Sequence, residues 1–260
     1  MEELSPLHPR AESLRIRKKL VEGFKRGLVV EEGLAAHGRG EAFDYLLGEK
    51  TTREARRAIR AAAAAMLLAK NPVISVNGNA AALVPNEVVD LSKVTGAKIE
   101  VNLFHPSEKR EAAIARWLRQ HGADEVYGLE PKFSQKIEEI HSNRRKVDQR
   151  GIAAADVVLV PLEDGDRTEA LRRLGKQVIA VDLNPISRTA RAANITIVDN
   201  IVRAFPLLVS NARDLSGKKE ARLLAIIRSF DNNANISATL KLMFKRLERL
   251  SRDIAKTFYG

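Results

Sequence analysis

The stretch from Gln177 to Pro206 constrains the fold more than any other part of the chain, because it contains two strand–turn–helix patterns in direct succession. Residues 178–181 form an apolar run rich in β-branched residues, which indicates a buried strand, and Asp182 follows it. Residues 195–198 repeat the pattern and lead into Asp199. Two neighbouring parallel strands should therefore each deliver a carboxylate to the same edge of a sheet, where ligands bind.

Short helices are predicted after both of these strands. Asn184-Pro185 is a turn signal, Ser187 is a candidate N-cap for a helix through residue 193, and Asn200 opens a second helix. Helix N-termini offer unpaired N–H groups to phosphate, and carboxylates suit ribose hydroxyls. Three arginines add positive charge to the stretch: Arg188, Arg191 and Arg203. The stretch therefore predicts a nucleotide site that lacks a glycine fingerprint.

Further strands separated by helices precede this stretch. The strand candidates are residues 73–76, 99–103, 125–127 and 157–161. Helices are predicted at 52–70, 107–121, 133–142 and 166–174, the last with Asp166 and Glu169 as a capping-box-like pair. This alternation predicts an α/β fold with a doubly wound, mainly parallel sheet.

Both ends of the chain are predicted to be helical additions to one domain. Residues 1–70, with a helix over 7–26, form the N-terminal part, residues 71–215 the nucleotide-binding core, and residues 216–260 the C-terminal helices. Seven residues of the last helix recur at alternating spacings of four and three: Ile236, Leu240, Met243, Leu247, Leu250, Ile254 and Thr257. Such a heptad seam predicts a subunit contact, and the alternative is a helix that lies on its own domain.

Three glycines, Gly33, Gly38 and Gly40, frame His37 and Arg39 before a helix that we expect from about residue 41. The spacing imitates a P-loop, but a P-loop needs Lys followed by Ser or Thr, whereas here Arg39 is followed by Gly40. We therefore exclude a P-loop. A phosphate contact and a plain helix–helix linker remain the two interpretations of this segment.

Polar residues elsewhere add candidates for ligand contact. Asn77, Gly78 and Asn79 follow the strand at 73–76, where either a ligand or an ordinary strand-to-helix turn would explain them. Arg17 either points into a site or is solvated on its helix. Asp164 is a candidate for a metal or ligand contact, and a turn aspartate is the alternative.

Composition restricts the classes of function. The chain of 260 residues has no cysteine, which excludes disulfides, thiolate metal sites and a cysteine nucleophile. No apolar run has the length of a membrane helix, and we expect a cytoplasmic protein. The net charge of +11 fits anionic metabolites better than nucleic acid, because the basic residues are interleaved with acidic ones. Few methionines and 30% charged residues are typical of a thermophile.

Several blocks of the sequence together resemble the archaeal phosphopantothenate synthetases, also called 4-phosphopantoate–β-alanine ligases. These blocks are GLAAHGRGEAFDYLLGE, NPVISVNGNAAALVP, VNLFHPSEKRE, VLVPLEDGDRTEAL, VDLNPISRTARAANITIVDNIVRA and DNNANISATL. The resemblance implies a homodimer with a Rossmann-like core. It also implies an ATP-dependent step of coenzyme A biosynthesis, in which 4-phosphopantoate and β-alanine give 4′-phosphopantothenate, AMP and pyrophosphate.

The resemblance also implies a set of site residues. The ATP contacts fall on Arg17, Arg39, Val181, Asp182, Leu183, Ser187, Arg188, Asp199, Asn200 and Ile201. Release of AMP and pyrophosphate indicates an acyl-adenylate, whose formation brings anions together and calls for cations and Mg²⁺. Arg39 and Arg188 are our candidates for phosphate charge. His37 either polarises a phosphate oxygen, accepts the amine proton, or is structural.

Some roles remain open at this level. The candidates for substrate contact are Asn77, Gly78, Asn79 and Arg203, and no metal ligand is predicted. Two other classes of function compete with the ligase. One is a dimeric, non-catalytic nucleotide sensor that uses the same strand ends, and the other is a basic nucleic-acid-binding protein.

Overall fold

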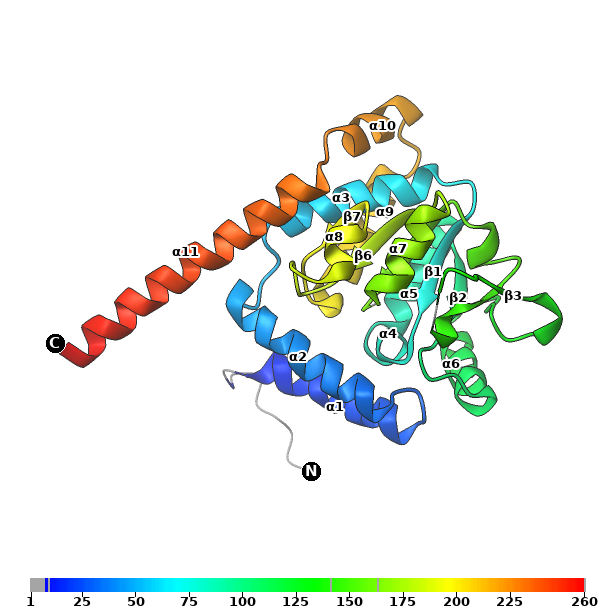
Figure 1. Ribbon diagram of the computed structural model, residues 1–260, viewed down its shortest axis with the longest axis horizontal. Helices are drawn as coiled ribbons and strands as arrows, with labels where there is room; N and C mark the ends of the chain where they lie inside the picture. The colour runs from blue at the N-terminus through cyan, green and yellow to red at the C-terminus, as the bar shows by residue number, and fades with distance from the viewer. Residues whose placement is uncertain (1–7, 9, 141, 163, 260) are drawn as a thin grey trace.

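The computed structural model of the chain describes residues 8, 10–140, 142–162 and 164–259. Its centre is a parallel sheet of five strands, which are β1 (Pro72–Val76), β2 (Lys98–Val101), β5 (Val157–Pro161), β6 (Gln177–Val181) and β7 (Ile195–Ile197). They lie in the order β2-β1-β5-β6-β7 (Figure 1). This is one of the doubly wound orders, and its switch point lies between β1 and β5. The predicted α/β, Rossmann-like fold class is confirmed.

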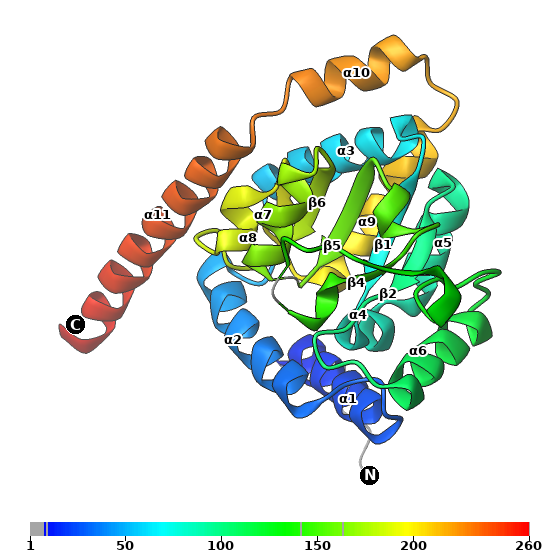
Figure 2. The same ribbon diagram turned by 45° about the vertical axis from the view of Figure 1, so that its right-hand side comes forward.

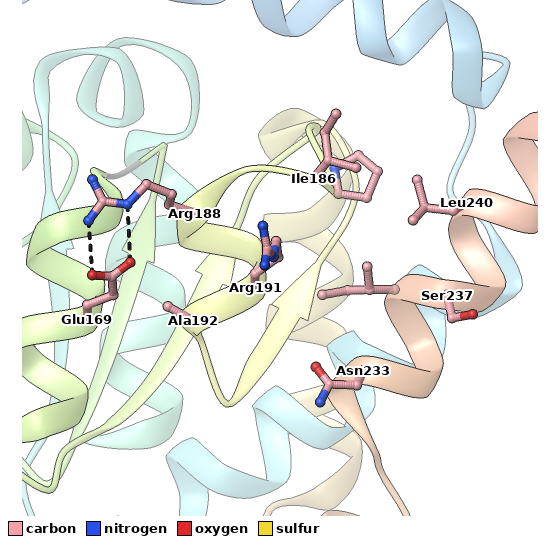
Figure 3. A pocket seen from close by; sticks show the side chains of 10 residues that line it. Glu169, Ile186, Arg188, Arg191, Ala192, Asn233, Ser237 and Leu240 are labelled. Carbon is pink, nitrogen blue, oxygen red and sulfur yellow. Dashed lines mark hydrogen bonds and ion pairs between the residues drawn. The ribbon is translucent and has the colours of Figure 1, made fainter.

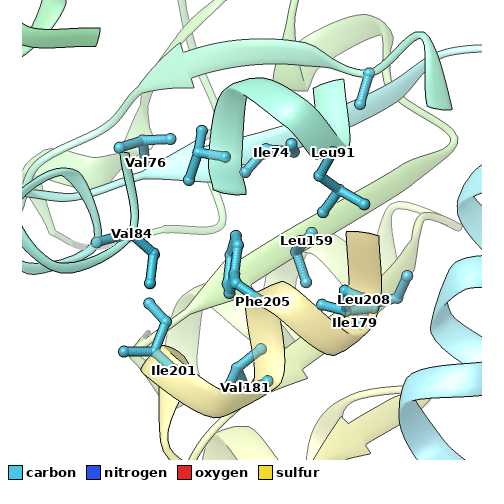
Figure 4. Packing of buried hydrophobic residues seen from close by; sticks show 14 of the residues in the cluster. Ile74, Val76, Val84, Leu91, Leu159, Ile179, Val181, Ile201, Phe205 and Leu208 are labelled. Atoms are coloured by element: carbon cyan, nitrogen blue, oxygen red, sulfur yellow. The ribbon is translucent and has the colours of Figure 1, made fainter. Parts of the chain in front are cut away.

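Helices cover both faces of the sheet. On one face, Ile74, Leu159 and Ile179 point toward Phe205 and Leu208 (Figure 4). The helices of this face are α3 (Arg53–Leu68), α5 (Pro85–Thr95), α6 (Glu108–Gln120) and α9 (Ile201–Leu215). Alternate strand residues turn to the opposite face, which is covered by α7 (Gly165–Arg173) and by residues 137–155. Each strand therefore buries both of its faces, which explains the continuous apolar runs.

The remaining helices surround this core. They are α1 (Ala11–Lys25), α2 (Glu31–Leu47), α4 (Gly78–Leu83), α8 (Arg188–Ala192), α10 (Glu220–Arg228) and α11 (Asn232–Tyr259). α1 and α2 lie beside the carboxyl edge of the sheet, and the C-terminal half of α11 stands away from the rest of the molecule (Figures 1 and 2). No helix among the described residues is long and apolar enough to cross a membrane.

The predicted caps have a mixed outcome. The side chains of Thr52, Ser107, Ser187 and Asn200 each accept a hydrogen bond from the first turn of their helix, as predicted for Ser187 and Asn200. The capping pair at Asp166 is wrong, because α7 begins at Gly165 and Glu169 pairs with Arg188 instead.

Three segments differ from the prediction. The helix predicted at 133–142 is wrong, since β3 (Ser134–Lys136) pairs antiparallel with β4 (Lys146–Asp148) there. Single turns of 3₁₀-helix lie at Pro131–Phe133, Asn143–Arg145 and Ile152–Ala154. The strand predicted at 125–127 reduces to one bridge between Tyr127 and Glu100. The glycine-framed segment is not a loop, because α2 already begins at Glu31, and the predicted helix start at residue 7 lies outside the described residues.

The heptad seam of α11 divides into two parts. Ile236 and Met243 are buried against the chain itself, whereas Leu240, Leu247 and Ile254 are exposed. The side chain of Thr257 lies outside the part of the chain that is described. The first turns of α11 therefore pack on the domain, and the exposed part of the seam has no cover within the described chain.

Candidate active site

A cavity of about 570 Å³ lies at the carboxyl edge of the sheet. Residues that follow four of the strands line it: Asn77 after β1, Leu103 after β2, Leu162 after β5 and Asp182 after β6. The opposite wall is α2, which contributes Gly33, Ala36, Arg39, Gly40 and Phe43. The cavity spans the switch point of the sheet, which is where ligands bind in open α/β folds.

At one end, the loop that follows β6 forms what we call the β6 end, consisting of residues 182–188 together with Arg39. The Ser187 hydroxyl donates to the Asp182 carboxylate, and the Asn184 N–H donates to it over 2.9 Å. Burial raises the pKa of the Asp182 carboxyl, and the hydrogen bonds from Ser187 and Asn184 oppose that shift. Asp182 is therefore a fixed acceptor at the mouth of the cavity.

Two arginines bring positive charge to the β6 end. Arg39 projects from α2 and is exposed on the cavity wall, close enough to stabilise the charged form of Asp182. Arg188 makes a two-pronged ion pair with Glu169, at 3.2 and 2.9 Å (Figure 3). Exposed pairs of this kind contribute little stability, so Arg188 can exchange Glu169 for a phosphate at small cost.

His37 and Arg17 lie outside the cavity lining, near Glu41. Arg17 is paired with Glu41 at 2.6 Å. Burial lowers the pKa of the His37 imidazole, although the Glu41 carboxylate opposes the shift. The Nε2 atom of His37 is buried and has no hydrogen-bond partner among the described residues. The lowered pKa favours the uncharged form of the His37 imidazole, and the His37 side chain does not line the cavity.

Asp199 is the second strand-end carboxylate, and it too lies behind the cavity wall. It is 1% exposed and accepts hydrogen bonds from Thr51 at 2.6 Å and from Arg203 at 2.7 Å. Arg203 also pairs with Asp44 at 2.6 Å, and Asn200 donates to the same carboxylate at 3.1 Å. This network ties α2 to α9. Val181 and Ile201 are buried in the core, and Leu183 lines the cavity.

The three residues after β1 line the cavity and also hold its walls together. The Asn77 amide donates to the carbonyls of Pro161 and Leu162 at 2.8 and 3.2 Å, and its oxygen caps α4. These bonds cross the switch point and hold Leu162 at a φ of 53°, an uncommon conformation for leucine. Asn79 donates to the Gly33 carbonyl at 2.8 Å and so anchors α2.

At the other end, three basic residues form what we call the cationic end: His105, Arg110 and Arg144. Arg110 comes from α6, and Arg144 from the 3₁₀ turn before β4. Asp164 lines the same cavity and pairs with Arg144 at 3.1 Å. None of these three basic residues was predicted from the sequence as part of the site. Asp182 was predicted because polar residues that directly follow a parallel strand lie at the ligand-binding edge, and the same reasoning applies to His105, which follows β2.

A buried carboxylate positions the segment that carries Arg144. Glu100 on β2 is fully buried and accepts hydrogen bonds from the N–H groups of Asp148 and Ile152, at 3.0 and 2.6 Å. Burial raises the pKa of Glu100 to about 7. Two residues further on, the Asn102 amide donates to the carbonyl of Lys146 at 2.8 Å and to that of Arg144 at 3.3 Å. The edge strand β2 thus fixes the far wall of the cavity.

No group of three or more His, Cys, Asp or Glu side chains suited to a metal ion occurs among the described residues. The carboxylates that line the cavity are Glu32, Asp164 and Asp182. An ion that arrives with a polyphosphate needs only one or two protein carboxylates, because phosphate oxygens and water complete its shell. The three lining carboxylates are therefore a donor set that fits an ion arriving with a polyphosphate.

Comparison with known proteins gives matches over most of the chain. The family described as phosphopantothenate/pantothenate synthetase matches residues 54–246. A Thermococcus kodakarensis protein named 4-phosphopantoate–β-alanine ligase is 53% identical over 247 residues, which cover 95% of this chain and 94% of that protein. Proteins of the same name are 51% identical in Thermococcus onnurineus, over 94% of this chain and 93% of that protein, and 48% identical in Methanosarcina mazei, over 95% and 96%.

Proposed function

The chain belongs to the phosphopantothenate/pantothenate synthetase family, and from this premise we propose that it is an ATP-dependent ligase of coenzyme A biosynthesis. It condenses 4-phosphopantoate with β-alanine to 4′-phosphopantothenate and releases AMP and pyrophosphate. We propose the cytoplasm as its location. The observation that carries the proposal is one cavity with the half-buried carboxylate of Asp182 and two arginines at the β6 end and further basic residues at the opposite end.

The proposed reaction has two steps. A carboxylate oxygen of the acid attacks the α-phosphorus of ATP, and the bond from that phosphorus to the bridging oxygen breaks to release pyrophosphate. The β-alanine nitrogen then attacks the acyl carbon and loses a proton to a base, the bond from that carbon to the phosphate oxygen breaks, and AMP leaves. The first step joins two anions, so positive charge fixed at the reacting phosphate lowers its barrier.

We assign the ATP to the β6 end. Asp182 accepts from the nucleotide's hydroxyl groups, Ser187 and Leu183 contact it beside that carboxylate, and Arg39 and Arg188 neutralise its phosphates. Arg39 faces the cavity directly and is our choice for the charge that develops at the α-phosphorus. Arg188 is the first residue of α8, and Arg39 lines the same cavity from α2.

The other assigned contacts do not line the cavity. The ATP contacts Arg17, Val181, Asp199, Asn200 and Ile201 rest on the family resemblance, and the substrate contact Arg203 and the base His37 rest on the chemistry of their side chains. The lowered pKa of His37 suits a group that accepts a proton from an amine. Asn77, Gly78 and Asn79 contact the acid from the cavity wall, and the hydrogen bonds of Asn77 also position that wall.

We propose Mg²⁺ as the ion that accompanies ATP, with Asp164 as the protein group that would hold it, because Asp182 is assigned to the hydroxyl groups of the nucleotide. The Asp164 carboxylate lines the cavity. When bound, Mg²⁺ offsets the charge of the triphosphate and polarises its oxygens. The protein's own contribution is to orient the acid and the nucleotide between α2 and the sheet.

We also propose a homodimer. A groove of about 760 Å³ lies between the loop at Pro185 and Ile186 and the first turns of α11 (Figure 3). Ile186 is 60% exposed at the rim of the groove, and α11 continues outward with exposed apolar side chains: Leu240, Phe244, Leu247 and Ile254. Exposed apolar surface of this extent is typical of interaction sites, and its heptad spacing fits the same helix of a second copy.

Resolving the nucleotide products by chromatography tests the proposed function. With ATP, 4-phosphopantoate and β-alanine, AMP and pyrophosphate should form in step with 4′-phosphopantothenate. ADP with free phosphate would mean an acyl-phosphate route, and binding of ATP without turnover would mean a nucleotide sensor.

A further inference from the structure

The cationic end contains two arginines, Arg110 and Arg144, in addition to the two that we assign to ATP at the β6 end. Arg110 reaches the cavity from α6, where its Nε donates to the Leu28 carbonyl at 3.0 Å and its Nη1 donates to the His105 carbonyl at 2.9 Å. These partners are neutral, and no ion pair with a carboxylate is formed by Arg110 within the described residues. The carboxylates of Glu32 and Glu111 act on it only at longer range.

The surroundings of Arg110 disfavour its charge. Burial lowers the pKa of the Arg110 guanidinium, and the nearby positive charge of Arg144 lowers it further. Arg144 is itself 6% exposed and is held in place by the contact of Asn102 with its backbone carbonyl. Two arginines brought together in a partly desolvated wall form a site that an anion would stabilise.

Gly78 lets Arg110 take this position. A Cβ atom at residue 78 would lie 2.7 Å from Nη2 of Arg110 and 2.0 Å from the Leu28 carbonyl oxygen. The start of α4, the chain at Leu28 and the guanidinium therefore meet at a spot where no side chain fits. The arginine is packed against the cavity wall at the end of β1 rather than extended into solvent.

We propose that Arg110, with Arg144 beside it, binds the phosphate group of the substrate acid and makes the enzyme select the phosphorylated over the non-phosphorylated acid. The proposal rests on the proposed ligase function.

The geometry of the reaction decides which anion of the acid goes to which end. 4-Phosphopantoate carries a carboxylate at one end of a four-carbon chain and a phosphate at the other. The carboxylate must lie at the α-phosphorus of ATP, at the β6 end. β1 and β6 are separated by β5, so their ends lie roughly 10 Å apart at the usual strand spacing. With the carboxylate at β6, the phosphate points toward β1, where Arg110 lies.

A site built to bond a charged group discriminates strongly against an analogue that lacks the group, because Arg110 then has only its neutral carbonyl partners. The wild-type enzyme should therefore use 4-phosphopantoate far better than pantoate. Arg110→Gln should lower kcat/KM for 4-phosphopantoate by about 10- to 100-fold, the usual effect of losing a hydrogen bond between charged groups, and leave kcat/KM for pantoate within about threefold.

The experiment measures the selectivity ratio, which is kcat/KM for 4-phosphopantoate divided by kcat/KM for pantoate. It also measures the KM for ATP and for β-alanine, in wild type, Arg110→Gln and Arg116→Gln. Arg116 is exposed on the same helix and does not line the cavity, so its variant is the matched control. A selectivity ratio that falls with Arg110→Gln alone, at an unchanged KM for ATP, supports the proposal. An unchanged ratio in folded Arg110→Gln overturns it, because a merely structural defect would lower both activities together.

Two further measurements separate this inference from the proposed function. Calorimetric titration with 4-phosphopantoate needs no turnover, so binding that weakens about 10- to 100-fold in Arg110→Gln supports the site even if no amide forms. Should that variant fail to fold, Arg110→Lys replaces it, since a lysine keeps the charge but loses the planar fork. Its selectivity ratio should fall by about threefold or more, and a ratio equal to that of wild type contradicts the proposal.

Discussion

The two ends of the cavity are assembled in opposite ways. The β6 end is contiguous in sequence, because Asp182, Ser187 and Arg188 belong to one strand–turn–helix unit and only Arg39 comes from elsewhere. The cationic end combines Arg110 from α6 with Arg144 from a segment that β2 holds in place. Local sequence therefore determines the first end, and tertiary packing determines the second.

This difference predicts how the ends respond to change. A substitution in the β6 end should alter nucleotide binding directly and leave the other end intact. The cationic end should also respond to residues that never touch a ligand, such as Glu100 and Asn102, because they fix the wall that carries Arg144.

The largest expected effect concerns the C-terminal part of the heptad seam on α11, which we assign to the proposed dimer contact. Changing both Leu247 and Leu250 to Asp places two charges in an apolar contact, so we expect the dimer dissociation constant to rise ~10³-fold or more. Analytical ultracentrifugation measures it. Because Ile186 lies next to Ser187, the loss of the dimer should weaken ATP binding more than acid binding.

The matched control for this experiment is the double change Arg249→Asp and Arg252→Asp, which adds two carboxylates on the outer side of the same turns. This control should remain dimeric. A folded Leu247→Asp/Leu250→Asp protein with unchanged dimer affinity would remove α11 from the interface.

Arg39→Ala should have the next largest effect. If Arg39 meets the charge that develops at the α-phosphorus, it matters more to the transition state than to the bound substrates. We expect kcat to fall ~10²–10³-fold, the range for loss of one electrostatic donor, with little change in the KM for any of the three substrates. Steady-state kinetics provides the test, and a kcat within threefold of wild type would take Arg39 out of the reaction.

Glu100→Gln should reveal the pH dependence of the wall behind the cationic end. The pKa of Glu100 is about 7 in the folded protein and about 4.3 in the unfolded chain. Between these values the folded state holds the extra proton, so the free energy of unfolding of wild type should fall as pH rises. Relative to Glu100→Gln, the expected fall is roughly 3 kcal/mol from pH 4.3 to pH 7, and little changes above that.

Urea unfolding of both proteins from pH 5 to pH 8 measures this difference. The ATP affinity of Glu100→Gln should match that of wild type, since Glu100 lies far along the sheet from β6. A difference in unfolding free energy that stays constant with pH would mean that Glu100 is ionised throughout.

The smallest effect is expected for the strand-end carboxylates. Asp182→Ala and Asp199→Ala should each weaken ATP binding by ~1–3 kcal/mol, the cost of a lost hydrogen bond to a charged group. Asp182 lines the cavity, whereas Asp199 is bound to Thr51 and Arg203 behind the wall. Calorimetry with ATP tests both, and wild-type affinity in both folded variants would place the nucleotide elsewhere.

The β6 end could be predicted from sequence because its signals are local. An apolar run followed by Asp182, a turn and a capping Ser187 specifies a strand, its end and the next helix without reference to the rest of the chain. The same logic identified Asp199 and Asn77, and it gave the fold class from the alternation of strands and helices.

The start of α2 could not be predicted, because Gly33 serves packing rather than flexibility. A Cβ atom at Gly33 would lie 2.5 Å from the Asn79 side-chain oxygen, whereas one at Gly40 would make an ordinary contact of 3.6 Å with Leu183. Glycine at residue 33 is thus required by a tertiary contact, while its sequence pattern is typical of a loop. Arg144 was missed for a related reason, since its short β3–β4 hairpin depends on Glu100 and carries no periodicity of its own.

The central claim is that one cavity holds ATP at the β6 end and the acid's phosphate at the cationic end. A crystal structure of the wild-type protein with a non-hydrolysable ATP analogue and 4-phosphopantoate tests it most directly. We predict the nucleotide phosphates against Arg39 and Arg188, the acid's phosphate against Arg110, and its carboxylate between them, facing the α-phosphorus. The acid bound in the reverse orientation, or the nucleotide at Arg110, would contradict the account.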